Sequence, residues 1–146
     1  MSYDSRQDTE RHIADVRHEL EGFAGDLYCR GLKHDLSKLN SQVEKDLFDE
    51  MTPILKTLEY GSDEYKASLA KLKPALDNHY AVNSHHPEHY PNGVDDMNLL
   101  DLVEMWCDWK AAVKRTASGD IAKSLEINRK RFGLSDQLYN ILKNSI

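Results

Sequence analysis

Apolar residues recur at intervals of three and four along most of the chain, which is the spacing of an amphipathic α-helix. The first such stripe predicts a helix from Asp8 or Thr9 to about Arg30. Its apolar members are Ile13, Val16, Leu20, Phe23 and Leu27. On a helical wheel His12 falls at the edge of this stripe and His18 falls on the solvent side. We therefore expect His12, and not His18, to face inward.

Two further stripes follow. One predicts a helix over about 34–58, and Ser62 is the expected cap of the next helix. Pro74 must kink that helix or begin a new one. The apolar spacing then continues through His79 to Asn83, which is unusual for polar groups unless they have buried partners.

A later helix is expected from about Met97 to Ala117, with Asp95 or Asp96 as its cap. On its wheel Asp108 lies where a broad apolar arc, which includes Trp106 and Trp109, meets a polar stripe. Small alanines flank Asp108 there, so it is the carboxylate best placed to face inward with space in front of it. Two more helices follow. The first is expected after Ser118-Gly119-Asp120, which is a turn and cap, and the second is capped by Ser135.

Strand signals are scarce. No run of alternating Val, Ile and Thr appears, and the one Asn-Gly pair, Asn92-Gly93, is typical of a loop in its context. The pattern predicts an all-α protein of five to seven helices. At 146 residues the chain suits a single domain over 1–146, with 1–8 as a flexible N-terminus.

Composition narrows the class of protein. No apolar run approaches the roughly 18 residues of a membrane span, and the polar start lacks the apolar stretch of a secretory signal. Cys29 and Cys107 are unclustered, so we expect small buried residues in a reducing, cytoplasmic setting rather than a disulfide framework. A formal charge of −6 argues against non-specific nucleic-acid binding, but it allows a local cationic pocket for a small anion.

The stretch His34-Asp35-Leu36-Ser37-Lys38 carries the strongest chemical signal. An adjacent His and Asp present a nitrogen and an oxygen ligand side by side, which suits a divalent transition metal. Lys38 lies one helical turn beyond His34, so its ammonium reaches what the metal binds. His12, His79 and Asp108, each turned inward on an apolar face, are the candidate companions of this pair.

Each of these residues also has a simpler explanation. A lone histidine on a helix face is more often a hydrogen-bonded core residue, and a lone Asp is more often a cap or an ion-pair partner. His85, His86 and His89 could simply be exposed in a loop bounded by prolines, and Glu104 could simply be solvated. Several inward-facing nitrogen and oxygen donors in one chain favour a metal site over these separate explanations.

The chain resembles the HD-domain superfamily of metal-dependent phosphohydrolases in His12-Ile13-x-x-Val16, in His34-Asp35-Leu36-Ser37-Lys38 and in a later helix with a lone Asp. More narrowly, it resembles an HD-like family common in phages and bacteria. The narrower likeness covers about residues 9 to 142. It is carried by His34-Asp35-x-Ser37-Lys38, by Asn83-x-His85-His86-Pro87-Glu88-His89, and by Met97-x-Leu99-x-Asp101-Leu102-x-Glu104-Met105-x-x-Asp108-Trp109-x-Ala111-Ala112.

The resemblance implies an HD-type helical bundle with one divalent metal, of open identity among Mn, Fe, Co, Mg, Zn and Ni. The metal ligands that it implies are His12, His34, Asp35 and Asp108. Histidines between the His-Asp pair and the last Asp serve a second metal or a phosphate in some HD enzymes, and this chain has His79, His85 and His86 in that interval.

The expected function is hydrolysis of a phosphate ester on a nucleotide or a similar small metabolite. Asp35 would orient the nucleophile, Lys38 would stabilise developing charge, and His79 or His86 would contact phosphate or protonate the leaving oxygen. Glu88 and Glu104 are candidates for orienting ligand histidines.

Two alternatives stay open at this point: a non-catalytic HD-like metal or nucleotide-binding module for sensing or sequestration, and a purely structural metal site. A homo-oligomer is left open, and no membrane partner is expected.

Overall fold

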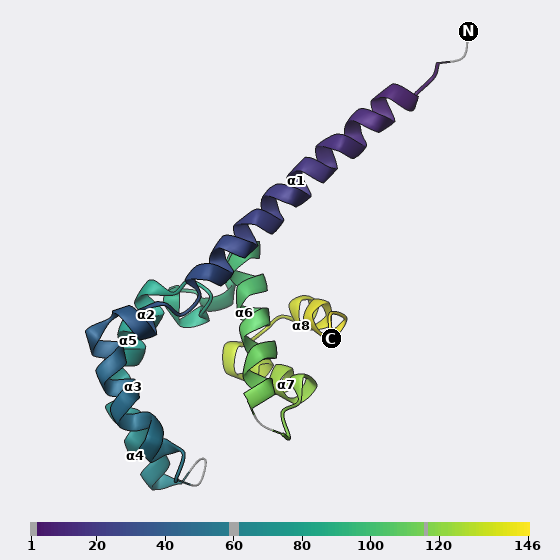
Figure 1. The fold of residues 1–146 in the computed structure, drawn as a ribbon. Coiled ribbons are helices and arrows are strands. Elements are labelled where there is room, and N and C mark those ends of the chain that lie inside the picture. The colour runs from purple at the N-terminus through teal and green to yellow at the C-terminus, as the bar shows by residue number, and fades with distance from the viewer. Residues whose placement is uncertain (1–2, 59–61, 116) are drawn as a thin grey trace. The chain divides into compact units, whose positions relative to one another are not determined.

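The computed structural model describes residues 3–58, 62–115 and 117–146, and these residues form helices joined by turns and loops (Figure 1). The predicted all-α class is confirmed. The described part holds seven α-helices of eight or more residues, within the predicted five to seven, and one shorter helix. None of these helices combines the length and the apolar character needed to cross a membrane.

The chain divides into two compact units, one ending at Lys33 and one beginning at His34. The first unit is the single helix α1 (Arg6–Lys33), which buries none of its residues. Its apolar stripe therefore has no packing partner within its own unit. Of the segment predicted to be flexible, residues 1 and 2 lie outside the described part, and 6–8 form the first turn of α1. A single domain over 1–146 stays a prediction.

The second unit contains all the other elements. Its first four α-helices are α2 (Ser37–Asn40), α3 (Gln42–Leu55), α4 (Asp63–Lys71) and α5 (Lys73–Val82). Two 3₁₀ helices, η1 (Pro87–His89) and η2 (Gly93–Asp96), lead into α6 (Leu99–Ala112), which continues as η3 (Val113–Arg115). The chain ends with α7 (Ile121–Phe132) and α8 (Asp136–Lys143).

Short polar side chains begin most of these helices. Ser62, Asp120 and Ser135 accept hydrogen bonds from backbone N–H groups in the first turns of α4, α7 and α8, as predicted. Ser41 caps α3 in the same way, and its extended backbone divides the helix predicted over 34–58 into α2 and α3. Pro74 stands at the start of α5, where its missing N–H costs nothing.

The start of α6 differs from the prediction. Asp95 and Asp96 belong to η2, and Asn98 is the cap. The Asn98 side chain accepts from the Asp101 backbone N–H, while the Asp101 carboxylate accepts from the Asn98 backbone N–H. This reciprocal capping box fixes the first turn of α6 more firmly than a single aspartate would.

A buried apolar cluster of the second unit forms where α6, α7 and α8 meet. Trp106 lies in this core, and Trp109 stacks on Phe132 with ring centroids 6.0 Å apart, as expected for the apolar arc of α6. The buried members of the cluster are Trp106, Leu125, Leu134, Tyr139 and Leu142. The expectation of buried cysteines is wrong, because Cys29 and Cys107 are both exposed.

Candidate metal centre

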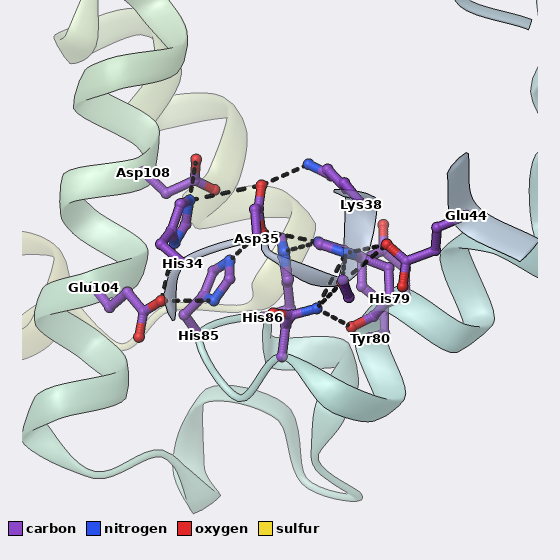
Figure 2. Close-up of polar contacts among 12 residues, drawn as sticks. His34, Asp35, Lys38, Glu44, His79, Tyr80, His85, His86, Glu104 and Asp108 are labelled. Atoms are coloured by element: carbon purple, nitrogen blue, oxygen red, sulfur yellow. Dashed lines mark hydrogen bonds and ion pairs between the residues drawn. The ribbon is translucent and has the colours of Figure 1, made fainter. Parts of the chain in front are cut away.

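The candidate site begins at the turn that joins the first unit to α2. Asp35 adopts a left-handed backbone conformation with φ 56°, which is uncommon for a residue other than glycine and which Asp tolerates better than most. This turn directs the Asp35 carboxylate toward three histidines (Figure 2). On its other side, Lys38 donates a hydrogen bond of 2.6 Å to Asp35 Oδ2.

The three histidines come from α5 and from the loop that follows it. The Nε2 atom of His79 lies 3.3 Å from Asp35 Oδ1, and the Nε2 atom of His85 lies 3.4 Å from the same oxygen. His86 Nε2 is 2.9 Å from His79 Nε2. His79 and His85 are each only 2% exposed. The simpler explanation of an exposed loop histidine is therefore wrong for His85.

Helix α6 contributes two carboxylates one turn apart. Glu104 Oε1 lies 2.9 Å from Nδ1 of His34 and 3.1 Å from Nδ1 of His85. Both imidazoles therefore direct an N–H toward the same oxygen, which leaves their Nε2 atoms facing the centre of the cluster. There His34 Nε2 is 3.6 Å from an oxygen of Asp35 and 3.6 Å from Asp108 Oδ1.

Glu44 of α3 belongs to this cluster, although it was not predicted from the sequence. Its side chain is fully buried and accepts hydrogen bonds from His79 Nδ1 at 3.0 Å, from Ser37 Oγ at 2.9 Å and from Asn78 Nδ2 at 2.7 Å. Glu44 thus holds His79 as Glu104 holds His34 and His85. The sequence contained one signal of this burial. Glu44 lies seven residues, or two helical turns, before the buried Met51 and therefore on the same face of α3.

The donor atoms form two overlapping groups, each with its atoms within 4.8 Å of one another. The first group is Asp35, His79, His85 and His86, and the second is His34, His85 and Asp108. Mixed imidazole and carboxylate donors suit divalent Mn, Fe, Co, Ni or Zn.

Two buried atoms test whether a cation fits this arrangement. Within the described residues, Asp35 Oδ1 and His85 Nε2 are buried and have no hydrogen-bond partner. A buried polar atom without a partner is costly and uncommon in folded proteins. A divalent cation would coordinate both atoms, so the donor set fits a metal.

The electrostatics of Asp35 keep its carboxylate ionised. Burial alone would raise the pKa of Asp35, but the nearby imidazoles of His79 and His85, together with the Lys38 ammonium, outweigh burial and hold this pKa well below its ordinary value. Asp35 therefore offers a negative oxygen at the point where both donor groups meet.

The histidines differ among themselves. The neighbouring carboxylates of Asp108 and Glu104 raise the pKa of His34 to about 10, against the opposing effect of burial. Burial and the two neighbouring imidazoles, first that of His85 and then that of His79, lower the pKa of His86 to about 3. The cluster thus has a side rich in carboxylates around His34 and a side of packed imidazoles around His86.

Glu88 and His89 make contacts outside both donor groups. Glu88 accepts a hydrogen bond of 2.8 Å from Arg131 on α7 and is not part of either donor group. His89 contacts the backbone oxygen of Tyr80 at 2.7 Å. His12 lies on α1, in the first unit, and its role as a ligand stays a prediction from the sequence.

Comparison with known proteins gives one match. The model of a family of unknown function (DUF5662) matches residues 1–146. No curated protein and no solved structure matches the chain.

Proposed function

The chain belongs to the family of unknown function DUF5662, and from its site we propose that it is a metal-dependent phosphohydrolase acting on a nucleotide or a similar small phosphate ester. The observation that carries this proposal is the convergence of two overlapping imidazole and carboxylate groups on buried atoms that lack hydrogen-bond partners in the described residues. The likeness of the His34-Asp35 segment to HD-domain enzymes supports the same class of reaction.

Asp35, His79, His85 and His86 would hold one divalent metal, and His34, His85 and Asp108 offer donors for the same ion or a second one. A divalent metal bound by such donors lowers the pKa of a coordinated water toward neutrality and neutralises charge on a phosphoryl oxygen.

The protein's own groups supply the rest of the chemistry. Lys38 is partly exposed beside Asp35, so its ammonium is available to stabilise negative charge on a phosphoryl oxygen as the ester bond breaks. Where the ion is held by His34, His85 and Asp108, His79 and His86 are not its ligands and are the candidates for a hydrogen bond to the phosphate or for protonation of the leaving oxygen. Glu44 and Glu104 keep the imidazoles in place through their Nδ1 atoms.

The test is turnover by the purified chain, stripped with a chelator and then supplied with Mn²⁺, Co²⁺, Mg²⁺ or Fe²⁺. The substrates are a panel of nucleotides and a generic phosphate ester. Asp35→Asn should abolish turnover while the fold persists, because Asn also accepts the left-handed conformation of that residue. Asp95→Asn, at an exposed position of η2, is the matched control and should retain turnover.

Metal-replete protein that hydrolyses nothing on this panel contradicts the proposal. If that protein nevertheless binds a nucleotide, the non-catalytic binding module takes the place of the enzyme.

A further inference from the structure

A cavity of about 490 Å³ adjoins the candidate metal centre at Lys38. Lys38 Nζ lies 2.6 Å from Asp35 Oδ2 and 5.7 Å from the centre of the Phe48 ring, which is another residue of the cavity wall. One ammonium group therefore connects the metal-ligand cluster to the cavity. All the residues involved belong to the second unit.

The charge of the cavity differs from that of the whole chain. Three cationic side chains, Lys38, Lys56 and Arg115, line it. No carboxylate of the described residues forms an ion pair with Lys56 or Arg115, while the chain as a whole carries a formal charge of −6. A cationic pocket on an acidic protein attracts a small anion selectively.

The same cavity has aromatic walls. Phe48 of α3 and Tyr65 of α4 line it together with leucine side chains. Aromatic faces stack on the π-systems of nucleobases without demanding a particular base. The volume is also within the usual range for sites that enclose small organic ligands, about 300–1,000 Å³.

We propose that this cavity binds the nucleoside part of a nucleoside phosphate, with the phosphate placed at Lys38 beside the metal-ligand cluster. The base packs on the rings of Phe48 and Tyr65, and Lys56 and Arg115 favour the anion over the neutral nucleoside. This inference rests on the proposed phosphohydrolase activity for the reaction, but the binding itself is tested independently of turnover.

The experiment measures equilibrium binding by titration calorimetry to the full chain without added metal. The probes are the four common ribonucleoside 5′-monophosphates, the corresponding nucleosides, ribose 5-phosphate and inorganic phosphate. We expect at least one nucleoside monophosphate to bind about 10-fold or more tightly than both ribose 5-phosphate, which lacks the base, and its own nucleoside, which lacks the phosphate.

Thr52 gives a variant that fills the cavity, because it lines the wall and is exposed, so a larger side chain there does not overpack the core. Thr52→Trp should weaken binding of the nucleoside monophosphate about 10-fold more than it weakens binding of inorganic phosphate. Thr57→Trp, at an exposed position outside the cavity lining, is the matched control and should leave both affinities unchanged. Phe48→Leu is a second variant, which removes the ring but keeps an apolar side chain.

The outcomes separate this inference from the proposed function. Selective nucleotide binding that Thr52→Trp removes, without any turnover, supports the cavity and contradicts the phosphohydrolase. Hydrolysis of the generic ester, with no preference for nucleoside monophosphates and no difference between Thr52→Trp and Thr57→Trp, overturns the cavity assignment and leaves the phosphohydrolase in place.

Discussion

At the residue scale, Glu104 determines how two of the histidines are oriented. One oxygen of this carboxylate receives contacts from Nδ1 of His34 and Nδ1 of His85. Glu104→Gln should weaken metal binding about 10- to 100-fold, because an amide oxygen is a weaker acceptor and the amide nitrogen turns a donor toward the imidazoles. Calorimetric titration with Mn²⁺ or Zn²⁺ measures the change.

Glu88→Gln is the control for that experiment, since Glu88 pairs with Arg131 outside the donor groups. Equal metal affinities for the two variants would show that Glu104 does not position the ligands.

His12 and His18 form a second matched pair, on the same helix and of the same residue type. The helical wheel and the HD-like segments both select His12 as a ligand. If His12 is the ligand that the resemblance implies, His12→Ala weakens metal binding about 10-fold or more, the effect expected for a residue that supports the metal, while His18→Ala does not. The same metal titration measures both, and identical affinities for the two variants would remove His12 from the site.

The sequence indicated part of this cluster in two ways, with His34 and Asp35 as an adjacent pair and with His79 and Asp108 as polar groups on apolar faces. His79 extended an apolar stripe, and the structure buries it among hydrogen-bond partners. Glu44 was missed although it obeys the same rule, because a glutamate near a helix start is ordinarily explained by solvation and by the helix dipole. What distinguishes Glu44 is its contact with a histidine 35 residues away, and helical phasing contains no information on such pairings.

At the element scale, Asp101 of α6 connects this helix to the segment 84–90, which carries His85 and His86. Its fully buried carboxylate accepts hydrogen bonds from Ser84 Oγ at 2.7 Å and from the Tyr90 hydroxyl at 2.6 Å, at either end of the segment that carries His85 and His86. It also completes the α6 capping box. The carboxylate therefore fixes a loop and a helix start at once.

Asp101→Ala should lower the free energy of unfolding by about 2–4 kcal/mol, because it removes a fully buried carboxylate that accepts hydrogen bonds from Ser84, from Tyr90 and from the Asn98 backbone N–H. Urea unfolding of the metal-free protein measures this loss. Asp96→Ala is the control. Among the described residues, the exposed Asp96 carboxylate accepts hydrogen bonds only from Asn92, so its removal should cost less than about 1 kcal/mol. A similar small loss for Asp101→Ala would contradict the role assigned to it.

The same residue shows why the helix boundaries were harder to predict than the helices. The apolar periodicity located α6, but two aspartates preceded it, and each was an acceptable cap on local grounds. Asp95 and Asp96 are instead taken up by η2, and the capping pair of Asn98 and Asp101 prevails because Asp101 is also held by the loop. Local propensity does not contain that tertiary contribution.

At the scale of the whole molecule, the described core and both donor groups lie after Lys33. Helix α1 buries none of its residues. A chain of residues 31–146 should therefore unfold in one cooperative urea transition. Its m-value should match the surface that its own core exposes on unfolding. Far-ultraviolet circular dichroism followed against urea measures the transition, with the full chain as the reference. A broad, non-cooperative loss of helix in the shortened chain would mean that the second unit depends on α1 to fold.

Metal titration of the folded 31–146 chain then tests independently whether His12 contributes to metal binding. Affinity equal to that of the full chain places every ligand in the second unit, whereas a loss that matches His12→Ala attributes the contribution of α1 to that one imidazole.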